Sequence, residues 1–196
     1  MHQSSLINME KFRDRYLADR KAQTLKILDL GSTDIGGCYR PLFEQPSWQY
    51  TGVDLSPGPN VDIVLRDPYD WKEVGSASVD LLVSGQVLEH VEFFWITMLE
   101  IARVLRPGGR LLSLDFNRPQ PALIRAAYLS YLTVVGAALG WLLHRDPDTY
   151  RYIPASIRRY PGAAGVAELL TARGFTEVRV VPLLCGLMTL HFARRR

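Results

Sequence analysis

Two aspartates occur near the ends of apolar, strand-like runs. Asp29 and Asp54 are the penultimate residues of LKILDL and WQYTGVDL, and Gly31 follows the first run. In dinucleotide-binding folds, an acid at the tip of the second strand accepts hydrogen bonds from ribose hydroxyls. A carboxylate at the end of the first strand can pair with an ammonium group. Either aspartate could instead cap a following helix. The residues assigned to a nucleoside-containing cofactor are Asp29, Gly31, Ser32, Asp54 and Leu55.

The loop GSTDIGGC at residues 31–38 discriminates between cofactors. It lacks the second glycine of the G-x-G-x-x-G fingerprint, which lets a pyrophosphate approach the backbone. It also lacks the lysine of a phosphate-binding P-loop, and Asp34 would repel a phosphate at close range. S-adenosyl-L-methionine carries no phosphate, but it carries an ammonium and a sulfonium that an acid favours. The loop therefore predicts S-adenosyl-L-methionine as the cofactor.

His90, in the segment VLEHV, is the predicted catalytic base. Its unperturbed pKa lies near neutrality, which suits it to take a proton from a methyl acceptor. Glu89 could orient His90, and both are assigned to the catalytic group. The alternative is that His90 bonds a backbone carbonyl or caps the following helix.

Strand-like and helix-like patterns alternate through the first two-thirds of the chain. Apolar spacing predicts a helix over residues 93–105 that stops at the PGG turn, and helical residues from about Cys38. A second helix, led by Pro161, is predicted to reach Arg173, before Gly174. This order predicts a doubly wound α/β sheet. The predicted strands are residues 25–30, 48–55, 60–65, 78–85, 110–116, 175–183 and 186–193.

The composition favours one domain, because 196 residues can bury a core without staples. The net charge of +3 is mild and the basic residues are scattered, which argues against a nucleic-acid partner. Cys38 and Cys185 are too few for a disulfide framework and lack metal-ligand spacing. The polar N-terminal segment has no apolar core of a secretory signal, so we expect a cytoplasmic protein.

Residues 126–143 form an uncharged segment of 18 residues, which is the lower limit for a membrane span. The strands predicted on both sides of it belong to one sheet, which argues against a span. Two interpretations stay open. The segment is either a plain core helix or an apolar lid or interfacial helix beside a lipophilic substrate.

The segment DLLVSGQVLEHVEFFWITMLEIARVLRPGGRLL resembles the signature of class I S-adenosylmethionine-dependent methyltransferases. With GVDLSPGPNVDIVLRDPYDW, it is similar to a methyltransferase-11-type domain. The resemblance implies a Rossmann-like, seven-stranded sheet whose last strand is antiparallel, with a helical apolar insertion before the last two strands. It also places Asp67 and Pro68 beside the adenine, and Ser84 and Gln86 beside the cofactor.

The C-terminal residues 146–195 resemble the tail of the ubiquinone/menaquinone C-methyltransferases. The segment YRYIPASIRRYP matches that family's Y-x-Y-L-x-x-S-I-R-x-x-P element. This resemblance implies a lipophilic quinol or related aromatic as methyl acceptor and favours the lid, with possible peripheral membrane contact. It assigns Tyr150, Tyr152 and Arg158 to the substrate.

Two departures from these families affect the site. The quinone methyltransferases carry G-[IL]-R-N after the fourth strand, where this chain has GQVL at residues 85–88. Some O-methyltransferases of quinone synthesis hold a divalent cation on E-x-x-E-H, but here neutral Gln86 replaces the first acid, so we expect no metal.

The expected organisation is one methyltransferase domain with four parts. These are an N-terminal helical extension (1–24), a cofactor-binding core (25–118), an apolar helical lid (119–160) and the last helix with two strands (161–196). Two alternatives to a quinol methyltransferase remain. The acceptor could be a small-molecule or glycan hydroxyl, or the chain could be a non-catalytic cofactor-binding module.

Overall fold

The computed structural model describes residues 3–196 and contains one seven-stranded sheet in the order β3-β2-β1-β4-β5-β7-β6. The strands are β1 (Leu25–Leu30), β2 (Trp48–Asp54), β3 (Ile63–Val64), β4 (Val79–Gly85), β5 (Leu105–Phe116), β6 (Phe175–Leu183) and β7 (Met188–Arg195). β7 lies antiparallel between β5 and β6, while β1 to β5 run parallel. The expected seven-stranded α/β sheet with an antiparallel last strand is therefore confirmed.

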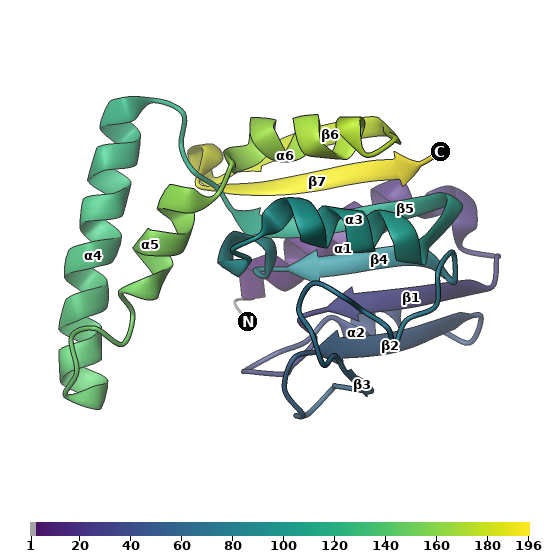
Figure 1. The fold of residues 1–196 in the computed structure, drawn as a ribbon, viewed down its shortest axis with the longest axis horizontal. Coiled ribbons are helices and arrows are strands. Elements are labelled where there is room, and N and C mark those ends of the chain that lie inside the picture. The colour runs from purple at the N-terminus through teal and green to yellow at the C-terminus, as the bar shows by residue number, and fades with distance from the viewer. Residues whose placement is uncertain (1–2) are drawn as a thin grey trace.

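Helices cover both faces of this sheet (Figure 1). They are α1 (Gln3–Tyr16), α2 (Arg40–Phe43), α3 (Phe94–Val104), α4 (Ala122–His144), α5 (Tyr152–Arg159) and α6 (Gly162–Ala172), with short 3-10 turns η1 (Ala18–Arg20), η2 (Leu88–His90) and η3 (Leu184–Gly186). In the orientation of Figure 1, α3 and α6 lie in front of the sheet and α1 and α2 lie behind it. This is the doubly wound arrangement that the alternating sequence pattern predicts.

The central strands are apolar along most of their length because both faces are covered. On β1, Leu28 and Leu30 join the core on the α3 and α6 side, whereas Leu25 and Ile27 join the core on the α1 and α2 side. Successive side chains of a strand point to opposite faces, so one short run supplies both cores.

The strand order reverses between β1 and β4. β1 pairs with β2 on one side and with β4 on the other, with Leu30 opposite Ser84. The chain therefore passes from one half of the sheet to the other after β3. In open α/β sheets, ligands bind outside the carboxyl ends of the strands at such a switch point. The carboxyl ends of β1, β2 and β4 are thus the expected place for a site.

Three predicted elements are shorter than expected or begin elsewhere. The helical segment expected from Cys38 is a single turn, α2, and the third strand is only two residues long. β5 begins at Leu105, before the PGG turn, and its register with β4 shifts between Val79 and Leu81. The turn is therefore part of an irregular strand entry rather than the end of the helix.

α4 stands away from the sheet, with α5 between it and the body (Figure 1). Only 6% of its most apolar 18-residue window is buried, although the helix is long and apolar enough to cross a membrane. The interpretation as a plain core helix is therefore wrong. Composition could not reveal this, because core helices and lipid-facing helices share the same residues.

Candidate functional site

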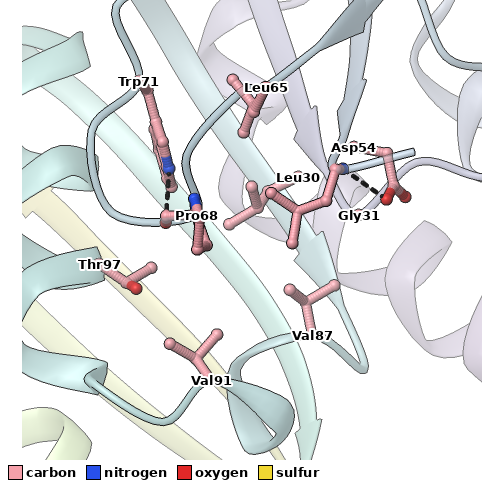
Figure 2. Close-up of a pocket in the computed structure, with 10 residues that line it drawn as sticks. Leu30, Gly31, Asp54, Leu65, Pro68, Trp71, Val87, Val91 and Thr97 are labelled. Atoms are coloured by element: carbon pink, nitrogen blue, oxygen red, sulfur yellow. Dashed lines mark hydrogen bonds between the residues drawn. The ribbon is translucent and has the colours of Figure 1, made fainter. Parts of the chain in front are cut away.

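A cavity lies at the carboxyl ends of β1 and β2, beside the loops that follow β3 and β4. Its empty space is about 430 Å³, which includes the part at its mouth that is open to solvent. Figure 2 shows Leu65 and Trp71 on one side of it and Val87 and Val91 on the other. The lining residues are Leu30, Gly31, Asp54, Leu55, Leu65, Pro68, Trp71, Val87, Val91 and Thr97.

The charge of this lining selects the kind of ligand. Asp54 is the only ionisable side chain among the ten lining residues, and none of the ten is a lysine, arginine or histidine. A phosphate needs donors or positive charge in its site. The lining therefore suits a ligand with an apolar face, hydroxyl groups and no phosphate.

Asp54 has its carboxylate held by the backbone. Its Oδ2 accepts from the Thr33 N–H at 3.1 Å, and its Oδ1 accepts from the Leu55 N–H at 2.7 Å. Neither bond caps a helix, since the element after β2 is the strand β3, so the alternative role of Asp54 as a helix cap is wrong. A carboxylate has about four acceptor positions, so two remain for ribose hydroxyls. The side chain is thus fixed in place beside the cavity without being fully occupied.

Gly31 forms the floor of the cavity and needs to be glycine for two reasons. Its φ of +74° favours glycine, and a Cβ there would stand 2.2 Å from Val87 Cγ2. Its N–H donates to the Val53 carbonyl at 2.8 Å. The glycine therefore lets the segment after β4 pack directly on the end of β1.

The start of the loop after Gly31 is held by side-chain hydrogen bonds that converge on Asn60. The Asn60 side-chain N–H donates to the Ser32 carbonyl at 2.7 Å, and the Ser32 hydroxyl donates to the Asn60 carbonyl at 3.1 Å. Arg40 Nε donates to Asn60 Oδ1 at 2.5 Å and its guanidinium stacks on Tyr50 at 4.4 Å. Ser32 is buried in this network and does not line the cavity.

Asp29 is buried at the end of β1, with 2% of its surface exposed. The Tyr50 hydroxyl donates to its Oδ2. Burial raises the pKa of Asp29 to about 7, and the bond from Tyr50 and the charge of Arg40 only partly oppose this rise. Asp29 is therefore an acid that a nearby cation would ionise at neutral pH.

Of the four residues that the family resemblance placed beside the cofactor, only one lines the cavity. Pro68 lines the cavity, and its carbonyl accepts from Trp71 Nε1 at 3.0 Å (Figure 2). Asp67 is exposed and caps the Tyr69 N–H at 2.7 Å, outside the lining. Ser84 is fully buried on β4, and Gln86 turns toward α1, where its side-chain N–H lies 3.4 Å from the Ser5 hydroxyl.

His90 and Glu89 point to different environments from the same 3-10 turn. The His90 side chain is 37% exposed, and its ring centroid lies 5.6 Å from that of Tyr152 on α5. The Glu89 side chain is fully buried, with its Oε1 3.7 Å from His90 Nε2. Burial lowers the pKa of His90, and the charge of Asp115 opposes this. Only His90 of this pair is open to a substrate.

The three predicted substrate residues are not brought together. Tyr152 lies beside His90. The Tyr150 hydroxyl lies 3.0 Å from His144 Nε2 and ties the end of α4 to the following loop. Arg158 is exposed on α5. Within residues 3–196, no group of His, Cys, Asp and Glu side chains is placed to hold a metal ion.

Several lining residues escaped the sequence analysis. Trp71 sits in a loop held by α3: its N–H donates to Glu100 at 2.9 Å, and its carbonyl accepts from Arg103 at 2.7 Å. Val87, Val91 and Thr97 reach the cavity only through the fold. The apolar positions of a loop carry no spacing signal, so only the DPYDW string around Trp71 could have pointed to the site.

Comparison with known proteins assigns the family. A family model described as the ubiE/COQ5 methyltransferase family matches residues 76–195, more than half of the 196-residue chain. The chain belongs to the ubiE/COQ5 methyltransferase family. A second model, described as a methyltransferase domain, matches residues 28–113. Both resemblances seen in the sequence are therefore confirmed.

The chain matches only part of the length of its curated relatives. The ubiquinone/menaquinone biosynthesis C-methyltransferase UbiE of Saccharophagus degradans is 35% identical over 96 residues, which is 49% of this chain and 39% of that protein. The demethylmenaquinone methyltransferase of a Parafrankia species is 38% identical over 100 residues, 51% of this chain and 39% of that protein. The matched region thus spans about two fifths of each relative.

The fold also matches solved structures. A SAM-dependent methyltransferase from Aquifex aeolicus superposes with a TM-score of 0.59 over the whole of both chains, at 13% identity. At that identity the likeness concerns the fold alone. It agrees with the seven-stranded sheet and places this member of the ubiE/COQ5 family among methyltransferase folds.

We predict that Gly31→Ala lowers the free energy of unfolding by about 1–3 kcal/mol, because alanine is strained at positive φ and its Cβ meets Val87. Denaturant unfolding measures the loss. Gly174→Ala is the matched control, since Gly174 has a φ of +84° and nothing within 4 Å of the position that a Cβ would take. In a Val87→Ala background, Gly31→Ala should cost no more than the control. An equal cost with and without Val87 would contradict this packing argument.

Proposed function

We propose that the protein is an S-adenosyl-L-methionine-dependent methyltransferase that methylates a lipophilic quinol or related aromatic. The observation that carries this proposal is the cavity at the carboxyl ends of β1 and β2, whose ten lining residues are mostly apolar and include Asp54 but no lysine, arginine or histidine. Family membership supports the reaction, and the names of two relatives support the class of acceptor.

The residues present fit this cofactor. Asp54 would accept from the ribose hydroxyls, and Leu30, Leu65 and Trp71 offer apolar surface for the adenine. Asp29, which has no lysine or arginine in an ion pair within residues 3–196, would hold the ammonium group directly or through water. The cofactor supplies a methyl group on a sulfonium, which is already activated toward a nucleophile.

The chain then positions the acceptor against the methyl group, excludes water from the site and accepts one proton. A quinol ring carbon becomes a stronger nucleophile when an adjacent hydroxyl loses its proton, and His90 is the exposed base beside the cavity segment that contains Val87 and Val91. Tyr152 lies next to His90 and would bound the acceptor ring. Because the His90 pKa is lowered, its imidazole is neutral and able to accept that proton at neutral pH.

The test uses labelled S-adenosyl-L-methionine, the full chain and reduced quinones of differing tail length. Asp54→Asn should raise the Michaelis constant for the cofactor about tenfold or more, because two hydroxyls lose a charged acceptor. Asp14→Asn is the matched control, since Asp14 is exposed on α1, pairs with Arg13 and Lys21 and does not line the cavity. The label should enter a quinone fraction.

Calorimetry with the cofactor alone separates the failures. If the parent chain does not bind S-adenosyl-L-methionine, the proposal that it is a methyltransferase is overturned. Binding without turnover on any quinol would indicate a non-catalytic cofactor-binding module. Label found only in water-soluble products would overturn the lipophilic acceptor and keep the methyltransferase.

The pH dependence of cofactor binding follows from Asp29. A carboxylate with a pKa of about 7 must lose its proton to face an ammonium, so affinity should fall up to tenfold per pH unit from about pH 7 down to 5.5. This window lies below the titration of the α-amino group, near 8. Asp29→Asn should bind more weakly and without this slope. The same slope in Asp29→Asn and the parent chain would contradict the role of Asp29.

We propose further that α4 lies in the interface of an anionic membrane. Residues 126–143 are uncharged, and the α4 side chains Leu123, Val134 and Leu142 are between 66% and 84% exposed. Arg125 and Arg145 bound the segment, and the Arg145 guanidinium lies 5.9 Å from the Trp141 ring. Aromatic and basic side chains at the ends of an apolar helix suit the headgroup region.

A flat position is favoured over a transmembrane one by the return path of the chain. The segment after α4 carries Arg145, Asp146, Asp148 and Arg151, and α5 has only eight residues, about 12 Å of helix. If α4 crossed a hydrocarbon core of about 30 Å, the chain would have to return through that core to reach the sheet. Because α5 is too short to span the core alone, the charged residues beside it would be buried in the hydrocarbon. Such a location would bring a lipid-dissolved acceptor to α5 and His90. The protein would then be cytoplasmic and peripheral at the membrane.

We expect the protein to sediment with vesicles that contain anionic phospholipid, and less so at high salt. The double variant Trp141→Ser/Leu142→Ser should lose most of this binding. Val64→Ser is the control, because Val64 is 41% exposed but lies on β3, the edge strand at the far side of the sheet from β6 and β7. Unchanged sedimentation of the double variant would contradict the membrane proposal. If the parent chain is a dimer that does not bind vesicles, and the double variant is a monomer, the result would contradict the membrane proposal and indicate that α4 docks to a second copy of the chain.

A further inference from the structure

Polar side chains are buried on one face of the sheet, next to the cavity but outside its lining. Ser84, Ser113 and His191 lie in register on β4, β5 and β7. Asp115 and Thr189 form the next pair along β5 and β7. All five are at most 2% exposed. A polar row of this kind in an apolar core is costly unless its hydrogen bonds are satisfied. The proposed methyl transfer gives no role to Ser113, Asp115, Thr189 or His191. The family resemblance placed Ser84 beside the cofactor, but Ser84 does not line the cavity.

Asp115 fastens the segment that carries the proposed base. Its Oδ1 accepts from the N–H groups of Val87 and Leu88, at 3.2 and 3.0 Å. These are the residues immediately before Glu89 and His90. Val87 also packs against Gly31 at the cavity floor. The position of His90 relative to the cavity is thus set from β5 through one carboxylate.

The other oxygen of Asp115 meets no N–H or O–H donor from residues 3–196. Glu89 is buried as well. Burial raises its pKa most, the charge of Asp115 and a side-chain hydrogen bond with Asp115 raise it further, and the backbone N–H groups of Glu89 and Phe116 oppose the rise more weakly. No lysine or arginine in the described part of the chain lies within 4 Å of either carboxylate; His90 is the basic group near Glu89, at 3.7 Å. Two ionised carboxylates cannot hydrogen bond to each other, so a buried contact of this kind requires a proton.

We propose that Glu89 and Asp115 share one proton and together carry a single negative charge, and that Asp115 is a positioning residue that holds His90 at the cavity and stabilises its protonated form. The role of His90 as base rests on the proposed function. The shared proton does not, because it follows from the contact alone. When an acceptor hydroxyl gives its proton to His90, the imidazolium forms beside the single charge of the pair.

Apart from His90 and the pair itself, the side chains of residues 3–196 whose pKa is shifted by the charge of Glu89 or Asp115 are three tyrosines and one histidine. Tyr39 precedes α2, Tyr128 comes from α4, Tyr160 follows α5, and His191 comes from β7; each has its pKa shifted by burial and also by the charge of Glu89, Asp115 or both. Burial lowers the pKa of His191 and raises the pKa of the three tyrosines, so these four side chains are neutral at pH 7. His90 is then the one group near the pair that gains charge near neutrality.

The two carboxyls have different expected behaviour when separated. With Asp115→Asn, Glu89 loses its carboxyl partner but stays protonated, because burial is the largest cause of its raised pKa, so the charge beside His90 is lost. With Glu89→Gln, Asp115 keeps its two N–H donors and ionises, so the charge remains. The pKa of His90 should therefore fall by about one unit in Asp115→Asn and stay within a few tenths in Glu89→Gln.

The first experiment is a titration of the His90 ring by NMR in the full chain, without cofactor or acceptor, with the signal assigned through His90→Gln. Equal shifts in the two variants, or a larger shift in Glu89→Gln, would overturn the proposal.

The second experiment is infrared spectroscopy of the parent chain at about pH 8.5, above the pKa of about 7 of Asp29. A protonated carboxyl C=O stretch should be present, should persist in Asp29→Asn and Asp115→Asn, and should disappear in Glu89→Gln. Absence of the band from the parent chain would overturn the shared proton whatever the variants do.

Methyl transfer distinguishes this proposal from the proposed function. In Asp115→Asn the turnover number should fall and the acidic limb of its pH profile should move down with the pKa of His90, whereas Glu89→Gln should keep the limb in place. No turnover by the parent chain, with both spectroscopic results as expected, would overturn the proposed function and leave the carboxyl pair intact. An unmoved acidic limb in Asp115→Asn would overturn the positioning role.

Discussion

The parallel pairing of β1 with β4 is the constraint on which the site depends. It brings the end of the first strand, at Leu30, beside Ser84, which is 54 residues later in the chain. The chain diverges from this pair to opposite faces, and the space between the diverging segments becomes the cavity. Gly31 allows Val87 to close against that floor. The loop that follows Gly31, the Trp71 loop and the turn with His90 are all placed relative to this one pair of strands.

The distribution of charged side chains determines which ligand suits the cavity and which surroundings suit α4. The cavity has an acid and no base, and Asp29 is buried without a lysine or arginine in an ion pair among residues 3–196, so a cation with apolar surface is the favoured ligand. Arg125 and Arg145 flank residues 126–143 of α4 and leave that segment uncharged, which suits an anionic interface with an apolar interior. A polar cofactor from water and an apolar acceptor from lipid would then reach the same edge of the sheet from different sides. This arrangement would explain why α4 is tolerated as an exposed apolar helix.

The sequence predicted the strands and helices well because both carry periodic signals. The positions of Gly31, Asp54 and Pro68 at the cavity followed from strand ends and from a family motif. Val87 and Thr97 could not be predicted, because their role exists only where distant segments meet. Asp115 was passed over in LLSLDF, where strand periodicity treats it as one more position of a buried strand. Glu89 and His90 are adjacent in sequence, and only the 3-10 turn shows that one is buried and the other exposed.

The central claim is that the cavity beside Gly31 and Asp54 is the cofactor site of a methyltransferase. A crystal structure of the full chain with S-adenosyl-L-homocysteine tests it most directly. The account predicts ribose hydroxyls on the Asp54 carboxylate, the adenine against Leu65 and Trp71, and the amino group toward Asp29. A cofactor bound elsewhere, or ribose hydroxyls that contact neither oxygen of Asp54, would contradict it.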